Sequence, residues 1–382
     1  MIRNILITGG AGFIGSQLSL HLVAKGHRVR VIDNLSPQIH GANEESSPLF
    51  RSIRGKVEFF RGSVTSRNDL LHVLPGIDTV VHLAAETGTG QSMYAIQHYS
   101  DVNIGGTALL LDLIANTPFP VRKIVVASSR AVYGEGKYVC AQHGNVFPPS
   151  RASEDMARGD FGVHCPRCGI PARMAPTDED TPVRPASVYG ITKLTQEQMV
   201  LTVAKALGIS AVAFRYQNVY GPGQSLSNPY TGILSIFSSR IRNGGSINIF
   251  EDGEESRDFV FLDDVVAATV KGIEYEMPLT DVFNVGSGIA TDVLTIANTL
   301  QRVLGQTVPV KISGQFRLGD IRHNVADLTK VGAALGFKPS ISVEEGLRRF
   351  VAWVNGEQIQ SDHYEESLEE LGVKGLLKRA SL

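Results

Sequence analysis

Residues 8–15 read Thr8-Gly9-Gly10-Ala11-Gly12-Phe13-Ile14-Gly15, a Gly-x-x-Gly-x-x-Gly stretch that follows an apolar run and opens an amphipathic one. The spacing predicts a tight turn between a strand at 5–8 and a helix at 12–25. Glycines in such a turn let backbone N–H groups approach a pyrophosphate, and the helix N-terminus favours its negative charge. On its own the glycine triplet is equally compatible with a purely structural turn.

The second predicted strand, 28–33, adds an independent indication of a ligand. It ends on Asp33, about 20 residues after the turn. A carboxylate at this place can accept hydrogen bonds from adenosine ribose hydroxyls and would repel a 2′-phosphate. The two features together predict a bound dinucleotide, and NAD in preference to NADP.

Strand and helix patterns alternate through the first half of the chain. Buried strands rich in Val and Ile are predicted at 5–8, 28–33, 57–61, 79–84, 122–128 and 210–215, with helices at 12–25, 66–74, 100–115 and 188–207. This alternation predicts an α/β fold, a doubly wound parallel sheet of the Rossmann type with helices on both faces.

Changes in composition suggest how the chain is divided. We expect an NAD-binding domain at 1–218, a smaller mixed α/β substrate domain at 219–355 interleaved with it, and a charged helical tail at 356–382. Residues 137–181 are rich in Pro, Gly and Cys and lack a clear period, so they are predicted to be an insertion in the first domain.

Charge and hydropathy exclude some classes of partner. The formal net charge of −2 gives no electrostatic reason to expect binding to nucleic acid or to an anionic membrane. Apolar runs such as 121–127 are far shorter than the ~20 residues of a membrane-spanning helix. The first residues lead straight into a predicted strand and leave no room for a signal peptide, so a cytoplasmic location is expected.

A candidate catalytic pair lies at the start of the predicted helix at 188–207. Tyr189 and Lys193 are four residues apart and therefore share one helix face. Lowering the pKa of a tyrosine from ~10 to ~7 requires ~4 kcal/mol, which a neighbouring ammonium and a positively charged nicotinamide can supply. The phenolate could then take a proton from a substrate hydroxyl while hydride leaves for NAD. Ser128 and Ser129, at the end of a predicted strand, could hold the reacting oxygen or simply form a strand-ending turn.

The insertion contains two similar short motifs, Cys140-Ala-Gln-His143-Gly and Cys165-Pro-Arg-Cys168-Gly. Three cysteines and one histidine in this arrangement can form a tetrahedral structural zinc site. Such a site would order a segment that has too few apolar residues to fold alone. His164 is a competing ligand. Three reduced thiols in a flexible loop, or a redox Cys-x-x-Cys motif, are the alternatives.

These motifs resemble the extended short-chain dehydrogenase/reductase family that acts on nucleotide sugars, particularly the UDP-galactose 4-epimerases, over residues 1–355 apart from the insertion. The resemblance implies that Ser129 is the catalytic hydroxyl, Tyr189 the base and Lys193 its activator. Ser63 stands where the family usually has Asp. The residues implied to bind NAD are Gly9, Gly12, Phe13, Ile14, Gly15, Asp33, Asn34, Ser63, Val64, Leu83, Ala84, Ala85, Asn103, Ser128, Tyr189 and Lys193.

The same resemblance implies a nucleotide-sugar site in the second half of the chain. Phe250 would stack on the base, Arg257 and Arg317 would clamp the diphosphate, and Asp320 would accept from the ribose. Thr87 and Gln91 would face the sugar. Ser129, Arg130 and Asn218 complete the implied set of substrate contacts. A homodimer through the helices at 100–115 and 188–207 is a further expectation from the family.

The residues after Ser129 help to select the reaction. Related dehydratases and decarboxylases carry carboxylates there, whereas this chain has Arg130-Ala-Val. The expected reaction is 4-epimerisation, with a tightly bound NAD restored in each cycle. Closer similarity is to dTDP-L-rhamnose 4-epimerases, which form dTDP-6-deoxy-L-talose. It rests on residues 85–93, on 227–232 and on the cysteine-bearing insertion. A UDP-hexose 4-epimerase, an NAD-dependent 4-keto-sugar-nucleotide reductase or dehydrogenase, and a non-catalytic NAD sensor are the alternatives.

Overall fold

A computed structural model describes residues 1–226, 228, 230, 232–359 and 364–381. Ser227, Pro229 and Thr231, from the motif at 227–232, lie outside the described residues. Within them, seven parallel strands form the main sheet in the order β13-β9-β5-β4-β1-β2-β3. Their bounds are β1 (Asn4–Thr8), β2 (Arg28–Asp33), β3 (Glu58–Arg61), β4 (Thr79–His82), β5 (Lys123–Ser129), β9 (Ser210–Tyr216) and β13 (Thr280–Val285). The predicted Rossmann-type sheet is confirmed.

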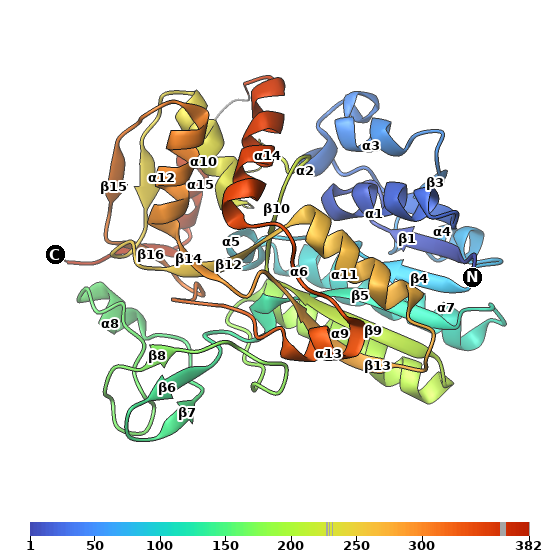
Figure 1. Cartoon of the computed structure of the whole chain (residues 1–382), viewed down its shortest axis with the longest axis horizontal. Coiled ribbons are helices and arrows are strands. Elements are labelled where there is room, and N and C mark those ends of the chain that lie inside the picture. The colour runs from blue at the N-terminus through green and yellow to red at the C-terminus, as the bar shows by residue number, and fades with distance from the viewer. Residues whose placement is uncertain (227, 229, 231, 360–363, 382) are drawn as a thin grey trace.

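Helices cover both faces of this sheet, as predicted (Figure 1). One face is covered by α1 (Phe13–Ala24), α3 (Pro48–Ile53), α11 (Leu262–Glu274) and α13 (Thr329–Leu335). The other is covered by α4 (Arg67–Val73), α7 (Gly106–Asn116) and α9 (Val188–Leu207). The strand order reverses between β1 and β4: β2 and β3 follow on one side, and β5 and β9 on the other. Ligands bind at this switch point in sheets of this type.

A smaller α/β unit lies beside the main sheet (Figure 1). It contains β10 (Asn218–Tyr220), α10 (Ile233–Arg242), β11 (Ile247–Ile249), β12 (Ser256–Phe261), β14 (Ala290–Asp292), α12 (Val293–Leu304), β15 (Val310–Ile312) and α14 (Val343–Gly356). These elements share a separate apolar core. Segments after residue 219 also return to the main sheet, because β13 pairs with β9 and α11 packs against α1. The boundary between an NAD-binding domain at 1–218 and a substrate domain at 219–355 therefore stays a prediction.

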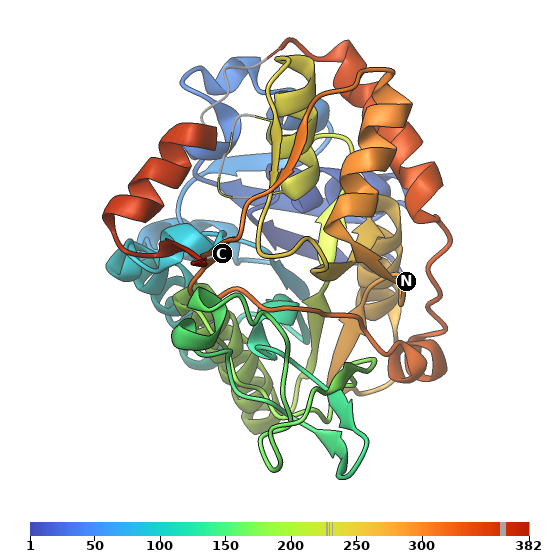
Figure 2. The same cartoon turned by 90° about the vertical axis from the view of Figure 1, so that its left-hand side faces the viewer.

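The predicted insertion has a small sheet of its own. The strands β6 (Tyr138–Cys140), β7 (Gly144–Val146) and β8 (Arg173–Met174) pair antiparallel in the order β7-β6-β8, and α8 (Ser153–Ala157) lies between β7 and β8 in the chain. Figure 2 shows that this sheet projects away from the main body of the molecule. Its buried apolar core is small: Tyr138, Cys140, Val146, Val163 and Cys165.

The tail at 356–382 differs from its prediction. It was expected to be helical, and α15 (Tyr364–Val373) is a helix, but Leu377–Arg379 forms the strand β17, antiparallel to β16 (Gln315–Arg317). Residues 377–379 form a strand because the edge of β16, about 60 residues earlier in the chain, supplies the hydrogen-bond partners for their backbone. The local sequence pattern does not reveal such long-range pairing. None of the helices in the described residues is long and apolar enough to cross a membrane.

Candidate active site

A cavity of about 460 Å³ opens at the carboxyl ends of β1, β2, β4 and β5. Most of the predicted contacts line it. Those predicted for the cofactor are Gly9, Gly12, Phe13, Ile14, Gly15, Asp33, Asn34, Ser63, Val64, Leu83, Ala84, Ala85, Ser128, Tyr189 and Lys193. Those predicted for the substrate are Thr87, Ser129, Arg130 and Asn218. The fold thus brings motifs from distant parts of the sequence to one space.

The glycine turn between β1 and α1 is too tight for side chains. A Cβ on Gly15 would lie 2.3 Å from the Gly9 carbonyl oxygen, closer than any real contact. Among the described side chains, none caps the N-terminus of α1, and its first turn carries no acidic residue. The first N–H groups of α1 therefore remain available beside the cavity, which suits a phosphate.

Asp33 supports this turn as well as facing the cavity. Its Oδ2 accepts from the Ala11 N–H at 3.0 Å, and its Oδ1 accepts from the Leu35 N–H at 2.9 Å. The buried side chain of His40 places Nε2 3.9 Å from the Asp33 carboxylate. Sequence reasoning missed His40, because no spacing relative to the glycines identifies it.

Ser129 and Tyr189 meet at the cavity wall. Ser129 ends β5, and Tyr189 lies in the first turn of α9, where the Ser187 side chain accepts from the Gly190 N–H at 3.1 Å. Burial raises the pKa of Tyr189, whereas a hydrogen bond with Ser129 and the positive charge of Arg130 act in the opposite direction. The predicted Ser–Tyr pair is therefore in contact, with Arg130 as the cation that favours the phenolate.

Lys193 lines the same cavity as Tyr189, but its amine has a partner that the sequence did not indicate. Its Nζ donates to Oε1 of Gln196 at 2.7 Å, and burial lowers its pKa to about 7. The Gln196 amide in turn donates to the Thr107 hydroxyl at 2.8 Å. Helical spacing places Lys193 on the same face as Tyr189, but this buried polar network determines where the amine points. Its role as activator of Tyr189 stays a prediction.

Two predicted contacts, Asn103 and Gln91, are not among the described residues that line the cavity. Oδ1 of Asn103 accepts from the Glu86 N–H at 2.8 Å, and its Nδ2 donates to the Glu86 carbonyl and the Thr192 hydroxyl. Asn103 therefore fixes the segment after β4 against α9. Oε1 of Gln91 accepts from Gln38 at 3.2 Å and from Tyr99 at 3.1 Å. Its contact with the sugar stays a prediction.

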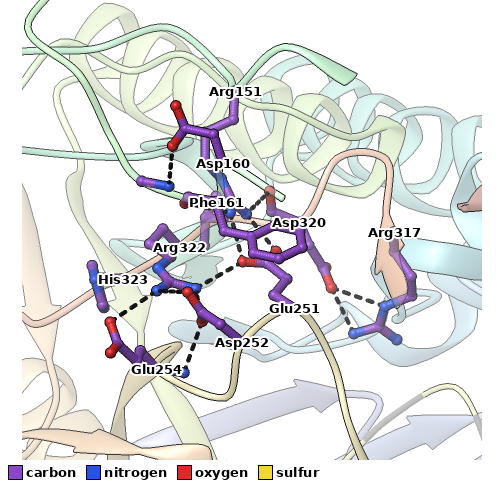
Figure 3. Close-up of polar contacts among 12 residues, drawn as sticks. Arg151, Asp160, Phe161, Glu251, Asp252, Glu254, Arg317, Asp320, Arg322 and His323 are labelled. Carbon is purple, nitrogen blue, oxygen red and sulfur yellow. Dashed lines mark hydrogen bonds and ion pairs between the residues drawn. The ribbon is translucent and has the colours of Figure 1, made fainter. Parts of the chain in front are cut away.

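Three of the residues predicted to bind the nucleotide lie together outside the cavity lining. The Arg317 guanidinium lies 5.0 Å from the ring centroid of Phe250. It also forms a 2.7 Å ion pair with Asp320 (Figure 3). Burial opposes ionisation of Asp320, but the Arg317 charge lowers its pKa. The Arg257 guanidinium donates to the backbone carbonyls of Ser256, Ile321 and Arg322 and so anchors that segment, while its charge contributes to the lowered pKa of Asp320. Its role as a diphosphate clamp stays a prediction.

Sequence reasoning also missed a buried ion pair beneath the catalytic residues. Glu197 pairs with Arg215 at 2.6 Å, and its other oxygen accepts from the Ser128 hydroxyl at 2.6 Å. Glu197 follows Lys193 by one helical turn, so the spacing could have indicated it. This pair connects α9 to the ends of β5 and β9.

The chain matches the model of the NAD dependent epimerase/dehydratase family over residues 5–152 and 167–286. It belongs to this family. The match confirms the resemblance inferred from the glycine turn and the Ser–Tyr–Lys set, and it supports NAD as the cofactor of this epimerase/dehydratase family member. The unmatched residues 153–166 fall within the insertion predicted at 137–181.

Curated relatives and solved structures agree with this assignment. The dTDP-L-rhamnose 4-epimerase of Burkholderia thailandensis is 40% identical over 92% of this chain and 95% of that protein. UDP-glucose 4-epimerase of Thermotoga maritima, solved with UDP-glucose, has a TM-score of 0.73 at 30% identity, covering 92% of this chain and 99% of that one. UDP-glucuronic acid 4-epimerase of Bacillus cereus, solved with UDP-glucuronic acid and NAD, has a TM-score of 0.75 at 25% identity with the same coverage.

Proposed function

We propose that the protein is an NAD-dependent nucleotide-sugar 4-epimerase that interconverts dTDP-L-rhamnose and dTDP-6-deoxy-L-talose. The observation that carries the proposal is the contact between Ser129 and Tyr189 in the same cavity as the glycine turn. The proposed substrate follows the relative from Burkholderia thailandensis, whose similarity covers almost the whole chain.

The residues around the turn fit NAD. The uncapped first turn of α1 suits its pyrophosphate, and the crowding at Gly15 matches a backbone that must approach a ligand closely. Asp33 borders the same cavity and would receive the adenosine ribose. Ser63, in place of the family's Asp, donates its N–H to Asp69 and shares a 2.8 Å hydrogen bond with the Thr65 hydroxyl. When bound, NAD would supply a reversible hydride acceptor.

The catalytic residues would manage the proton on the sugar 4-oxygen. Ser129 would hold that oxygen by a hydrogen bond while Tyr189, as phenolate, takes its proton. The 4-keto sugar would then rotate in the pocket to present its other face to the nicotinamide, and Tyr189 would return its proton to the 4-oxygen as hydride returns to C4 on that face. Burial raises the pKa of Tyr189, and the charge of Arg130 opposes this rise and so would favour the form that accepts the proton.

The acidic groups of the cavity support epimerisation over dehydration. Among the described residues that line the cavity, the carboxylates are Asp33 and Glu86. Asp33 accepts from the glycine turn, and Glu86 lies 3.3 Å from the exposed side chain of His98. An elimination needs both an acid and a base near C5 and C6 of the sugar, and with Asp33 placed for the adenosine ribose these residues offer one carboxylate at most.

The nucleotide would be bound by the group of Phe250, Arg317 and Asp320. Phe250 provides an aromatic face, Arg317 a planar guanidinium suited to phosphate oxygens, and Asp320 an acceptor for ribose hydroxyls. Stacking on the base, ion pairing with the diphosphate and hydrogen bonding to the ribose are possible with both dTDP and UDP. A homodimer through α7 and α9 and a cytoplasmic location stay predictions.

A panel of nucleotide sugars tests the proposal. Purified protein, without added cofactor, would be incubated with dTDP-L-rhamnose, UDP-glucose and UDP-glucuronate and followed by NMR. UDP-glucuronate is included because Arg130 places a cation at the cavity wall. Conversion of dTDP-L-rhamnose to its C4 epimer is the expected result. In a parallel reaction with added NAD, NADH formation stoichiometric with product would instead indicate a dehydrogenase. Preferential turnover of a UDP sugar would overturn the substrate assignment.

A further inference from the structure

The insertion brings four potential metal ligands to one point. Sγ of Cys140 lies 3.6 Å from Nδ1 of His143 and 3.7 Å from Sγ of Cys168, and Sγ of Cys165 lies 3.5 Å from the same imidazole nitrogen. All four ligand atoms are within 4.8 Å of one another. Tetrahedral zinc, with Zn–S of about 2.3 Å and Zn–N of about 2.0 Å, requires ligand atoms about 3.5 to 3.8 Å apart.

The backbone around the ligands is arranged for thiolates. The Gln142 N–H donates to Sγ of Cys140 at 3.4 Å, and the Arg167 N–H donates to Sγ of Cys165 at 3.4 Å. Gly144 and Gly169 follow the two motifs with φ of +65° and +72°, a conformation that residues with side chains rarely adopt. Two turns of the same design therefore face each other across the ligand cluster.

The insertion needs a stabilising element besides apolar packing. Two of the five buried residues in its core, Cys140 and Cys165, are themselves ligands. All three cysteines are free thiols in the structure. A bound metal would link the motif at β6 to the motif before β8 and would limit the freedom of the loop between them.

That loop carries Arg151, which reaches the nucleotide side of the molecule. Nη1 of Arg151 pairs with Glu251 at 2.6 Å, and its Nε pairs with Glu135 at 3.0 Å. Its Nη2 donates to the backbone carbonyl of Asp320 at 3.3 Å (Figure 3). The side chains of the two ion pairs are at most 4% exposed, so their charges depend on one another for compensation.

A second contact from the loop reaches the same place. Phe161 packs against Phe316, with ring centroids 6.2 Å apart, and its carbonyl accepts from Nη1 of Arg151 at 3.1 Å. Phe316 precedes Arg317, and Glu251 follows Phe250. Arg151 and Phe161 therefore contact the immediate neighbours of the group predicted to bind the nucleotide.

We propose that Cys140, His143, Cys165 and Cys168 bind one structural zinc ion, and that this ion orders the loop through which Arg151 positions Glu251 and Asp320. The nucleotide-binding role of that region rests on the proposed function. The metal itself does not, because its ligands are outside the cavity.

Metal content is the first test. Protein purified without chelator and without a metal-affinity step should contain about one zinc per chain by elemental analysis. Cys165→Ser should lose the metal, whereas His164→Ala, a change in the neighbouring imidazole, should keep it. Cobalt added to chelator-treated, reduced protein should give the absorption of a tetrahedral thiolate complex. Less than about a tenth of an equivalent in the native protein, or no thiolate absorption with cobalt, would overturn the site.

The link to the nucleotide is tested separately. Arg151→Met should keep its zinc and NAD and weaken binding of dTDP about tenfold by calorimetry. Zinc removal from the native protein by a chelator should weaken dTDP binding similarly and expose the 137–181 segment to proteolysis. Because dTDP binding requires no turnover, failure of the epimerase proposal would not obscure the result. Unchanged dTDP affinity in both zinc-depleted protein and Arg151→Met would overturn the link.

Discussion

The amine of Lys193 donates to the side-chain oxygen of Gln196 at 2.7 Å, and both residues lie on the buried face of α9. Nε2 of His82 lies 3.3 Å from the Gln196 amide, and burial lowers the pKa of His82 to about 3. Burial lowers the pKa of Lys193 from its ordinary value of 10.5 to about 7, and the charge of Glu197 opposes this shift without cancelling it.

This low pKa predicts a pH dependence of stability in the cofactor-free protein. Between pH 7 and 10.5 the unfolded chain keeps the Lys193 proton while the folded chain has released it, so the free energy of unfolding rises with pH. The slope from this group is at most about 1.4 kcal/mol per pH unit. Urea unfolding of the wild type and of Lys193→Met should reveal it as a pH-dependent difference. Parallel curves for the two proteins would contradict the assignment.

Tyr189→Phe tests the proposed base. Loss of the phenol removes the group that exchanges the proton with the sugar oxygen, so turnover should fall about 10³-fold while bound NAD is retained. Tyr133→Phe is the matched control, because the Tyr133 hydroxyl donates to Asn284 at 2.8 Å, away from the cavity. That control should lose stability and keep turnover. Normal activity of Tyr189→Phe would exclude the mechanism.

Arg130→Gln should move the acidic limb of the kcat/KM profile to higher pH. Arg130 lowers the pKa of Tyr189 through its charge, so removing it makes the phenolate form only at higher pH. Asn218→Ala is the control: it removes the acceptor of the 2.6 Å hydrogen bond from Arg130 and keeps the charge. The limb should stay in place in that control. A shift of equal size in both variants would point to altered geometry instead.

Glu197→Leu should destabilise the fold by about 3–5 kcal/mol, because it leaves Arg215 buried without its carboxylate partner. Urea unfolding measures this change. The double variant Glu197→Leu/Arg215→Met removes both charges and should be more stable than the single variant. Equal destabilisation by the single and double changes would show that the ion pair is not the source of the effect.

Features with a strict local spacing were predictable from the sequence. The turn from Gly9 to Gly15, with Asp33 at the end of the next strand, is such a feature, because phosphate binding and ribose binding impose those positions. The two Cys-containing motifs are similar, since two ligands in one short turn require a fixed separation. The hydrogen-bond partners of Gln91, Asn103 and Arg257 could not be predicted in this way, because distant segments of the chain supply them.

Six strands of the sheet, the dinucleotide turn and the residue types of the candidate catalytic set could be predicted from the sequence, since these depend on periodicity and on short-range spacing. The packing of distant segments sets Arg130 as the cation acting on Tyr189 and directs Lys193 to Gln196. It also makes the end of the tail a strand beside β16. The physical reason is the same in each case. Hydrogen bonds and charges between buried groups depend on which segments of the chain lie beside one another, and the folded core fixes that arrangement.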